Sequence, residues 1–296
     1  MGQFINLSAA DGLSFPAYVA EPAGKARGAV VVLQEIFGVN SHIRAVADGY
    51  AADGYLAVAP AAFHRVKQGV ELGYTADDMG AGIALKSAVE ALPAPGVMAD
   101  IEAAVAYASR AGKVGVVGYC WGGFLTWVAC TRLKGFAAGV SYYGGGIGGV
   151  AAEKPGCPVQ FHFGEKDHAI PMTDVARVRD AGHRRVEVHV YPAGHGFNCD
   201  ERGSFDAASA RQARARAIAF FAAHVAGEAA PAPKAKAKTA AKPKAKAKAP
   251  AKPKPSAKAK PKAAARPKAK IKAKPAAKAK SRLKPKARPK SRSRRR

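Results

Sequence analysis

The sequence contains little cysteine, and its cysteines are widely spaced. Only 4 occur in 296 residues, at positions 120, 130, 157 and 199, without a Cys-x-x-Cys pair. A chain of this length does not need disulfides to hold its core, so we expect reduced thiols and a cytoplasmic setting. The sequence also lacks the run of about 20 apolar residues that a membrane span requires. Its start, MGQFINLSAADG, lacks the basic and apolar regions of a secretion signal.

Acidic and aromatic residues are missing from the C-terminal part of the chain. Residues 229–296 contain 28 Lys and Arg, 11 of the 20 prolines, no Asp or Glu and no aromatic residue. Residues 1–228 carry 20 Lys and Arg against 21 Asp and Glu. A segment with so much like charge cannot bury enough apolar surface to offset its ordering entropy. We therefore predict one folded domain over residues 1–228 and a disordered polycationic tail over residues 229–296.

The charge of this tail predicts binding to polyanions. Its composition resembles the lysine-rich tails of linker histones and of similar bacterial proteins, which bind DNA through charge alone. Cations that neutralise phosphates release counterions, so such binding weakens with salt and carries no base specificity. We expect nucleic acid or another polyanion as the partner of residues 229–296, with association to the nucleoid. A solubilising extension without a dedicated partner is the alternative.

Apolar runs alternate with helical patterns throughout residues 1–228. This alternation predicts a three-layer α/β domain with a mostly parallel sheet. The irregular stretch 61–96 is expected to carry a helix over the end of the sheet where α/β folds place ligand sites. The expected strands are Phe15–Ala20, Ala29–Leu33, Leu56–Ala59, Val114–Val117, Ala137–Tyr142, Val159–Phe163 and Val186–Tyr191, and the expected helices are Ile43–Asp53, Met98–Arg110, Gly122–Arg132, Thr173–Gly182 and Phe205–Val225.

A nucleophile motif follows one of these strands. Gly118, Tyr119, Cys120, Trp121 and Gly122 form the Gly-x-nucleophile-x-Gly pattern, in which a tight strand-to-helix turn lifts the central side chain above the sheet. At a helix N-terminus the dipole stabilises a thiolate, and backbone N–H groups can hold an oxyanion. We therefore predict that Cys120 is a nucleophile. A buried structural cysteine beside a glycine-rich turn is the alternative.

Two later loops supply a carboxylate and a histidine. Asp167 follows one expected strand, and His195, which lies between two glycines, follows the next. The order Cys120, Asp167, His195 is that of an α/β-hydrolase triad, so we predict that Asp167 orients His195 and that His195 is the base. The competing residues are Glu165, Asp174, which we expect in the first turn of the next helix, and His162, His168, His183 and His189, which we expect to be surface or strand residues.

In these motifs the chain resembles the dienelactone hydrolase family. The matching segments are QEIFGVN at 34–40, GYCWGG at 118–123, GEKDHAIP at 164–171 and AGHGFNCDERGSF at 193–205. The resemblance covers essentially all of residues 1–228. It implies an α/β-hydrolase fold with a Cys-His-Asp triad and no metal or organic cofactor. It also implies opening of an enol-lactone ring, in which Cys120 attacks the carbonyl and water releases the acyl enzyme.

The resemblance implies further roles around Cys120. The matching glutamate of the family, here Glu35, approaches the cysteine and helps to form the thiolate when substrate binds. That role is chemically reasonable because a carboxylate beside a neutral thiol can accept its proton. A loop-stabilising Glu35 is the alternative. The backbone N–H groups of Ile36 and Trp121 are implied to form the oxyanion hole.

The substrate-binding arginines depart from the family pattern. The best-known members place arginines around the substrate carboxylate, one of them four residues after the catalytic histidine, where this chain has Cys199. Arg202 lies close enough in sequence to substitute and is the candidate substrate-binding residue, whereas the stretch 61–96 offers Arg65. Because a bound carboxylate normally requires a bidentate arginine, another lactone or a small ester fits as well as dienelactone.

The sequence thus predicts a soluble cysteine-dependent hydrolase of a small lactone or ester that carries a polyanion-binding tail. One alternative is a nucleic-acid-associating structural protein built on an inactive hydrolase scaffold. A general carboxylesterase or thioesterase is the other. The natural substrate and the oligomeric state are not indicated by the sequence. Cys130, Cys157 and Cys199 are expected to be buried small apolar residues.

Overall fold

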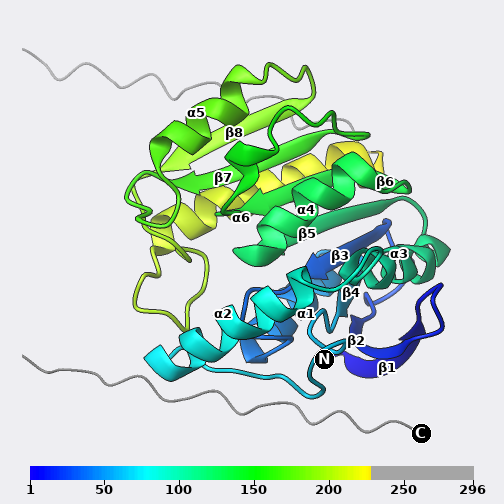
Figure 1. The fold of residues 1–296 in the computed structure, drawn as a ribbon. Helices are drawn as coiled ribbons and strands as arrows, with labels where there is room; N and C mark the ends of the chain where they lie inside the picture. Colours follow the sequence, from blue (N-terminus) through cyan, green and yellow to red (C-terminus); the bar gives the residue numbers. More distant parts are fainter. Residues whose placement is uncertain (228–296) are drawn as a thin grey trace, which may run out of the picture. The chain divides into compact units, whose positions relative to one another are not determined.

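The computed structural model describes residues 1–227, which form an eight-stranded sheet with helices on both faces (Figure 1). Its strand order is β1-β2-β4-β3-β5-β6-β7-β8. The strands from β4 through β3 to β8 pair in parallel, while β1 and β2 are antiparallel to each other and β2 is antiparallel to β4. The strands are β1 Gln3–Ser8, β2 Ser14–Ala20, β3 Ala29–Leu33, β4 Leu56–Pro60, β5 Val114–Tyr119, β6 Phe136–Tyr142, β7 Val159–Gly164 and β8 Val186–Tyr191.

The helices form the two outer layers. Helices α1 and α6 pack on one face, where the rings of Tyr50 and Phe221 lie 5.8 Å apart. Helices α3, α4 and α5 cover the other face (Figure 1). The helices are α1 Ser41–Ala52, α2 Ala76–Glu90, α3 Val97–Ala108, α4 Trp121–Arg132, α5 Met172–Asp180 and α6 Ala207–Phe221, with short helical turns at η1 Ser109–Ala111, η2 Ile147–Gly149 and η3 Ala222–Ala226.

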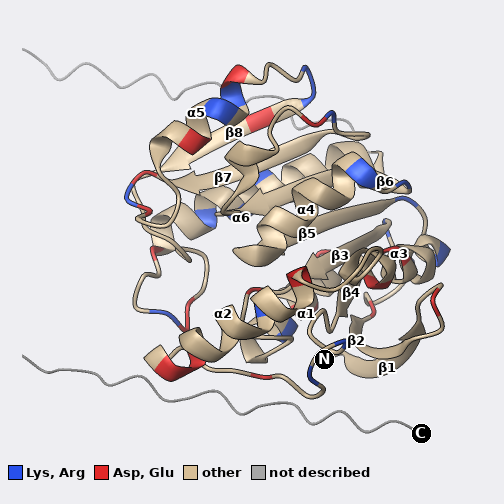
Figure 2. Ribbon diagram, viewed as in Figure 1, with Lys and Arg blue, Asp and Glu red and all other residues tan. Residues whose placement is uncertain are grey.

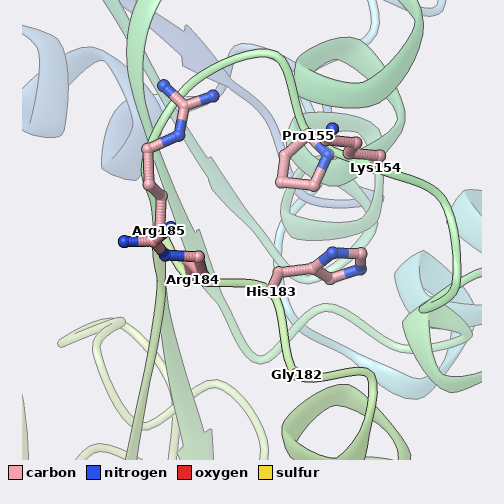
Figure 3. A pocket seen from close by; sticks show the side chains of 6 residues that line it. All are labelled: Lys154, Pro155, Gly182, His183, Arg184 and Arg185. Atoms are coloured by element: carbon pink, nitrogen blue, oxygen red, sulfur yellow. The ribbon is translucent and has the colours of Figure 1, made fainter.

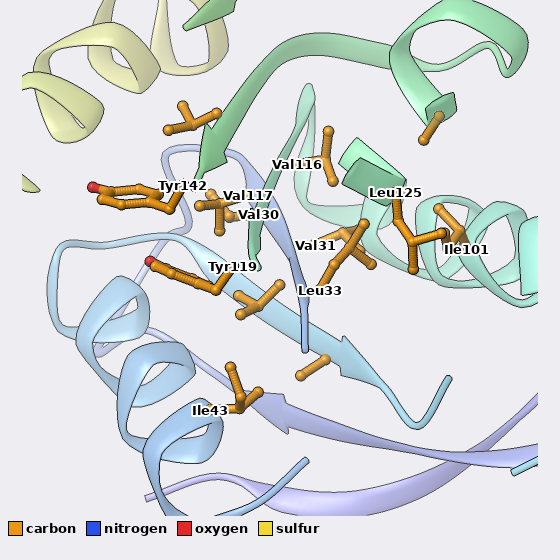
Figure 4. Close-up of a cluster of buried hydrophobic side chains, with 14 of the residues drawn as sticks. Val30, Val31, Leu33, Ile43, Ile101, Val116, Val117, Tyr119, Leu125 and Tyr142 are labelled. Atoms are coloured by element: carbon orange, nitrogen blue, oxygen red, sulfur yellow. The ribbon is translucent and has the colours of Figure 1, made fainter. Parts of the chain in front are cut away.

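The central strands form because their β-branched residues are buried on both faces. Every residue of β3 and β4 is buried, as the continuous apolar runs of a parallel sheet predict. Figure 4 shows the result around β3 and β5: Ile101 and Leu125 from helices α3 and α4 lie on one side of the sheet, and Tyr119 and Tyr142 lie on the other. The rings of Tyr119 and Tyr142 stack at 4.8 Å between centroids.

Side-chain caps fix where several helices begin. Asn40 accepts the N–H of Ile43 at the start of α1. Thr75 and Asp78 form a capping box at the start of α2, which satisfies two backbone donors that the helix leaves unpaired. These caps position α1 and α2 directly after loops at the C-terminal ends of the strands, on the side of the sheet that carries the predicted site.

The three-layer α/β prediction is confirmed for the described residues, with one strand missed. The sequence did not predict β1, an edge strand in which Phe4 is largely exposed and only Leu7 is fully buried, so its apolar pattern is weak. Helix α2 lies in the stretch 61–96 as expected. It crosses the end of β3 so closely that a Cβ atom on Gly82 would lie 2.3 Å from the carbonyl oxygen of Ile36.

The burial expected for three of the cysteines is confirmed. All four thiols are free, and Cys130, Cys157 and Cys199 are buried. Within residues 1–227, no helix combines the length and the apolar character needed to cross a bilayer. The predicted tail, residues 229–296, lies outside the described residues.

Candidate active site

Cys120 occupies the sharp turn between β5 and α4. Its backbone angles are φ 52° and ψ −114°, a conformation that L side chains rarely adopt and that glycine usually supplies. The turn is held from both sides, because the Cys120 N–H donates to the carbonyl of Tyr142 at 3.0 Å and its carbonyl accepts the N–H of Phe124 at 3.2 Å. The side chain is partly exposed. The backbone therefore presents Cys120 at the end of the sheet.

Two glycines permit this turn because no side chain fits at their positions. A Cβ atom on Gly118 would lie 1.9 Å from the carbonyl oxygen of Gly122. A Cβ atom on Gly122 would lie 2.3 Å from the carbonyl oxygen of Leu33. The start of α4 therefore touches the end of β3, which brings the loop that follows β3, with Glu35 and Ile36, next to the nucleophile turn.

Asp167 and His195 meet as the sequence predicts. The loop after β7 carries Asp167 and the loop after β8 carries His195, and their Oδ2 and Nδ1 atoms lie 2.8 Å apart. The other carboxylate oxygen, Oδ1, accepts the backbone N–H groups of Ala169 and Ile170 at 2.9 and 3.2 Å. The Asp167 side chain is fully buried. This arrangement fixes the carboxylate and orients the ring, so that Nε2 is the nitrogen left for chemistry.

The surroundings of His195 favour its protonated form. Burial lowers the pKa of His195, but the hydrogen bond to Asp167 and the interaction with Cys120 outweigh burial and raise the pKa to about 10. The interaction with Cys120 also indicates that the imidazole and the thiol are neighbours. The raised pKa of His195 favours the imidazolium form, which stabilises a nearby thiolate and can donate a proton.

Glu35 lies near His195, and one of its carboxylate oxygens forms no hydrogen bond with the described residues. Its side chain is fully buried, and Arg202 Nη1 donates to Oε1 at 3.2 Å. Among the described residues, Oε2 has no hydrogen-bond partner. Burial raises the pKa of Glu35, although Arg202, His42 and His195 act in the opposite direction. A buried carboxyl group with a raised pKa is suited to accept a proton.

The structure engages Arg202 with Glu35 and with aromatic rings. The guanidinium carbon lies 5.6 Å from the ring centre of Phe37 and 5.8 Å from that of Tyr74. The other arginine considered from the sequence, Arg65, binds Asp100 through two 2.8 Å hydrogen bonds and also pairs with Asp11. Arg65 thus serves a structural ion pair. The role of Arg202 toward a substrate stays a prediction.

The proposed oxyanion donors lie on the two segments that meet at the turn. Trp121 is the first residue of α4, where backbone N–H groups lack an acceptor within the helix. Its indole is fixed by stacking on Phe63 at 5.1 Å and by a 3.1 Å bond to Glu90. Ile36 is held on the opposite segment, under helix α2. Both residues are therefore anchored by the stretch 61–96.

Tyr143 lies beside His195, and the sequence did not indicate this neighbour. It has φ 37°, and the edge of its ring meets the His195 ring at 5.2 Å. Its buried hydroxyl has no partner among the described residues. Burial raises the pKa of Tyr143 well above its ordinary value, and the charges of Glu35, Cys199 and Cys120 add to this effect. The one sequence signal is its place at the end of β6, just before a run of glycines.

The competing residues lie elsewhere. Glu165 and His168 are exposed. Asp174 lies in the first turn of α5, as expected, and bonds to Arg177. His162 is a buried strand residue held by Tyr191 and Gln160, His183 bonds to the carbonyl of Ala151, and His189 lies in β8 beside Glu187.

A second, basic pocket opens at the other end of the strands. It has a volume of about 610 Å³ and is lined by Lys154, Pro155, Gly182, His183, Arg184 and Arg185 (Figure 3). These residues precede β7 and β8, whereas Asp167 and His195 follow the same strands. The basic pocket is therefore separate from the triad.

Comparison with known proteins identifies the family. The sequence profile of the dienelactone hydrolase family matches residues 15–225. A relative from Synechocystis sp., named "Putative carboxymethylenebutenolidase", is 36% identical over 221 residues, covering 68% of this chain and 88% of the relative. A relative of the same name from Escherichia coli is 34% identical over 230 residues, covering 71% and 83%.

A solved structure agrees with this assignment. The crystal structure of a "Putative Dienelactone Hydrolase" from Klebsiella pneumoniae superposes with a TM-score of 0.65 at 30% sequence identity, covering 75% of this chain and 98% of that protein. The family profile spans the turn at Cys120 as well as the loops with Asp167 and His195. The chain is therefore a hydrolase that belongs to the dienelactone hydrolase family.

Proposed function

We propose that the protein hydrolyses small lactones or esters through Cys120, Asp167 and His195. The observation that carries this proposal is the pair of His195 Nδ1 and Asp167 Oδ2 at 2.8 Å, beside a cysteine held at φ 52° on a strand-to-helix turn. A nucleophile, a base and a residue that orients the base are the three parts that acyl transfer requires. The membership in a hydrolase family supports the same reaction class.

Glu35 provides the acceptor for the thiol proton. The hydrogen bond to Asp167 raises the pKa of His195 and favours its imidazolium, so Glu35 is the better candidate to accept the thiol proton of Cys120. Glu35 Oε2 is buried and lacks a partner in residues 1–227, and the pKa of this carboxyl is raised by burial. Transfer of the proton to Glu35 leaves a thiolate beside the His195 imidazolium, which stabilises it.

Two acyl-transfer steps complete the reaction. The thiolate attacks the substrate carbonyl, and the N–H groups of Ile36 and Trp121 stabilise the oxyanion. The carbon–oxygen bond of the lactone or ester then breaks, and His195 gives its proton to the leaving oxygen, so that a thioester with Cys120 remains. Neutral His195 next takes a proton from water, the hydroxide attacks the thioester, and the carbon–sulfur bond breaks to restore the thiolate and the imidazolium.

The direct test compares the full-length protein with Cys120→Ala on dienelactone, aryl esters and a thioester. We expect kcat/KM to fall by about 10⁴-fold or more, because the histidine and the aspartate of a triad contribute little once the nucleophile is removed. Cys157→Ala is the matched control, since this buried cysteine precedes β7 whereas Asp167 follows the same strand. Trapping of an acyl group on Cys120, detected by mass spectrometry, provides the second measurement.

The substrate panel also separates the alternatives. Preference for dienelactone would indicate that Arg202 holds a substrate carboxylate, whereas preference for neutral aryl esters or thioesters would indicate a general carboxylesterase or thioesterase. Unchanged turnover in Cys120→Ala would overturn the mechanism. Absence of turnover in both proteins would favour the nucleic-acid-associating structural protein on an inactive scaffold.

We also propose that residues 1–228 form the catalytic domain and that residues 229–296 bind nucleic acid or another polyanion. The support is the contrast in charge. Lys, Arg, Asp and Glu are interspersed along the described residues (Figure 2), whereas residues 229–296 carry 28 cations and no anion. Contacts between lysines and phosphates release counterions and give affinity without base specificity.

The tail proposal is tested by deleting residues 229–296. We expect the full chain to bind duplex DNA with an affinity that falls steeply with salt, and the shortened protein to lose this binding while it keeps its turnover. Thermal unfolding of both proteins checks that the domain remains folded. Equal DNA binding by the two proteins would overturn the proposal and direct attention to the basic pocket in Figure 3.

A further inference from the structure

Three side chains with metal-binding atoms converge next to the proposed active site. They are Glu35 from the loop after β3, His42 from helix α1 and Cys199 from the loop before α6. All three residues are buried, and one ligand atom from each lies within 4.8 Å of the other two. A carboxylate oxygen, an imidazole nitrogen and a thiolate sulfur form a mixed ligand set that suits zinc, whereas magnesium and calcium prefer oxygen alone.

Two of these three residues each have a buried side-chain atom without a partner in the described part of the chain. Within residues 1–227, neither Glu35 Oε2 nor His42 Nε2 has a hydrogen-bond partner. Leaving such groups unpaired is costly because they lose their hydrogen bonds to water, so buried polar atoms normally have partners. A cation between them would satisfy both atoms at once.

The other atoms of these residues are already held in a way that suits metal binding. Asp200 Oδ1 lies 3.3 Å from His42 Nδ1, and a carboxylate on the far nitrogen is the usual arrangement that directs Nε2 of a ligating histidine toward a metal. Arg202 occupies Glu35 Oε1 at 3.2 Å and leaves Oε2 available.

Charge and access are both compatible with a divalent cation. Glu35, Asp200 and the Cys199 thiolate would supply three negative charges, which match those of Arg202 and one zinc ion, after the thiol releases its proton to solvent. A cavity of about 240 Å³ is lined by His42 and Asp200, so it reaches one edge of the cluster. Zinc bonds of about 2.0–2.3 Å require the ligand atoms to approach one another by roughly 1 Å, which side-chain rotation can provide.

We propose that Glu35, His42 and Cys199 bind a zinc ion, and that the bound zinc inhibits hydrolysis by occupying Glu35 Oε2. The inhibition rests on the proposed role of Glu35 as acceptor of the Cys120 proton, whereas the binding does not. Because residues 229–296 contain no His, Cys, Asp or Glu, the tail adds no ligand of these kinds and the full chain can be used in the test.

The experiment is a titration of the full-length protein with Zn²⁺, followed by calorimetry and by turnover, with Mg²⁺ as the control ion. We expect one tight site per chain, inhibition that a chelator reverses, and no effect of Mg²⁺. The Cys120→Ser variant should keep the tight site. In His42→Asn and Cys199→Ser, zinc binding should weaken by at least about 100-fold, since loss of a residue that only orients a metal ligand already costs about 10–100-fold.

Two additional variants keep the result unambiguous. Asp200 is largely exposed, so Asp200→Asn should fold normally and weaken zinc binding by about 10-fold or more. Cys157→Ser removes a buried thiol outside the cluster and should leave zinc binding unchanged. Co²⁺ replaces Zn²⁺ as a spectroscopic probe, and its thiolate absorption band should persist in Cys120→Ser and disappear in Cys199→Ser.

The outcomes that would overturn the proposal are distinct from failure of the proposed reaction. Loss of the site in Cys120→Ser, together with normal affinity in His42→Asn and Cys199→Ser, would place the zinc on Cys120 and His195. Tight binding at the proposed site without inhibition would support the site but overturn the role of Glu35 in thiol activation.

Discussion

Two buried carboxylates of this protein are each paired with an arginine, and the two pairs differ in how completely they are satisfied. Both oxygens of Asp100 accept hydrogen bonds from Arg65, at 2.8 Å each. Glu35 uses one oxygen for Arg202 at 3.2 Å and leaves the other without a partner in residues 1–227. The first pair ties the stretch 61–96 to α3, and the second lies near His195.

The difference separates a carboxylate that stabilises the fold from one that is available for chemistry. Burial raises the pKa of both Asp100 and Glu35, and the paired arginine opposes that rise in each case. Of the two, only Glu35 has an oxygen without a partner among residues 1–227, and a ligand atom of its carboxylate lies within 4.8 Å of the Cys199 sulfur. An unsatisfied buried group is costly, so we interpret it as a functional feature rather than as a packing defect.

The largest effect on turnover is expected at a third buried carboxylate, Asp167. Both of its oxygens have hydrogen-bond partners, and it belongs to the proposed triad. Asp167→Asn retains the shape of the side chain but removes the negative charge that orients the His195 ring and favours its protonation. We expect kcat/KM to fall by about 10³–10⁴-fold with little change in fold. Steady-state kinetics and circular dichroism check this. A decrease in kcat/KM below about tenfold would show that Asp167, like Asp100, is a structural carboxylate whose oxygens are fully hydrogen-bonded.

Asp100→Asn is the structural counterpart. Removing one partner of a buried ion pair leaves Arg65 with an uncompensated charge, although Asp11 remains beside it. We expect the free energy of unfolding to decrease by about 3 kcal/mol, while kcat/KM of the folded protein changes less than threefold or so. Urea unfolding and kinetics on the same sample test both halves. A large loss of turnover in well-folded Asp100→Asn protein would contradict the distinction between a structural Asp100 and a functional Glu35.

Glu35→Gln is expected to lower turnover more than stability, the reverse of Asp100→Asn. Its effect on turnover should be smaller than that of Asp167→Asn. The amide cannot accept the thiol proton, so kcat should fall by about 10²-fold, the lower end of the usual contribution of a general base. Stability should change less than in Asp100→Asn, because one oxygen of Glu35 is unpaired in the folded protein. Matched unfolding curves of the two variants provide the comparison, and wild-type turnover by Glu35→Gln would count against thiol activation by Glu35.

The pH profile gives the smallest but most specific effect. The pKa of His195 is raised to about 10, so kcat/KM should remain high in the neutral range and decline as the imidazolium loses its proton near that pH. Because the Asp167 hydrogen bond is the main cause that raises this pKa, Asp167→Asn should move the alkaline decline to lower pH. An alkaline decline at the same pH in both proteins would exclude His195 as its origin.

The sequence predicted those parts of the molecule that depend on local chemistry. The turn at Cys120 requires glycine on both sides, and the order of nucleophile, acid and base follows the chain, so the pairing of Asp167 with His195 could be anticipated. The strands Ala29–Leu33 and Val186–Tyr191 were predicted with their observed bounds because their apolar runs are continuous.

The parts that were not predicted depend on contacts between distant segments. Glu35, His42 and Cys199 have no motif spacing in common, and only the folded chain brings them together. The partner of Arg202 could not be inferred either, because its direction depends on the loop before α6. Tyr143 has an unusual backbone angle that no residue pattern encodes.

The backbone at Cys120 has one more consequence, which concerns how the protein withstands mutation. A residue other than glycine at φ 52° carries a conformational cost of about 1–3 kcal/mol in the folded state. Cys120→Gly should therefore make the protein harder to unfold while it abolishes turnover. Stability alone would favour replacement of this cysteine, so a lineage that ceased to need the reaction would be expected to lose Cys120 early. The residue that would make this turn most stable and the residue proposed to carry the reaction are therefore different, and comparing the free energies of unfolding of the natural protein and Cys120→Gly measures how far the two requirements diverge.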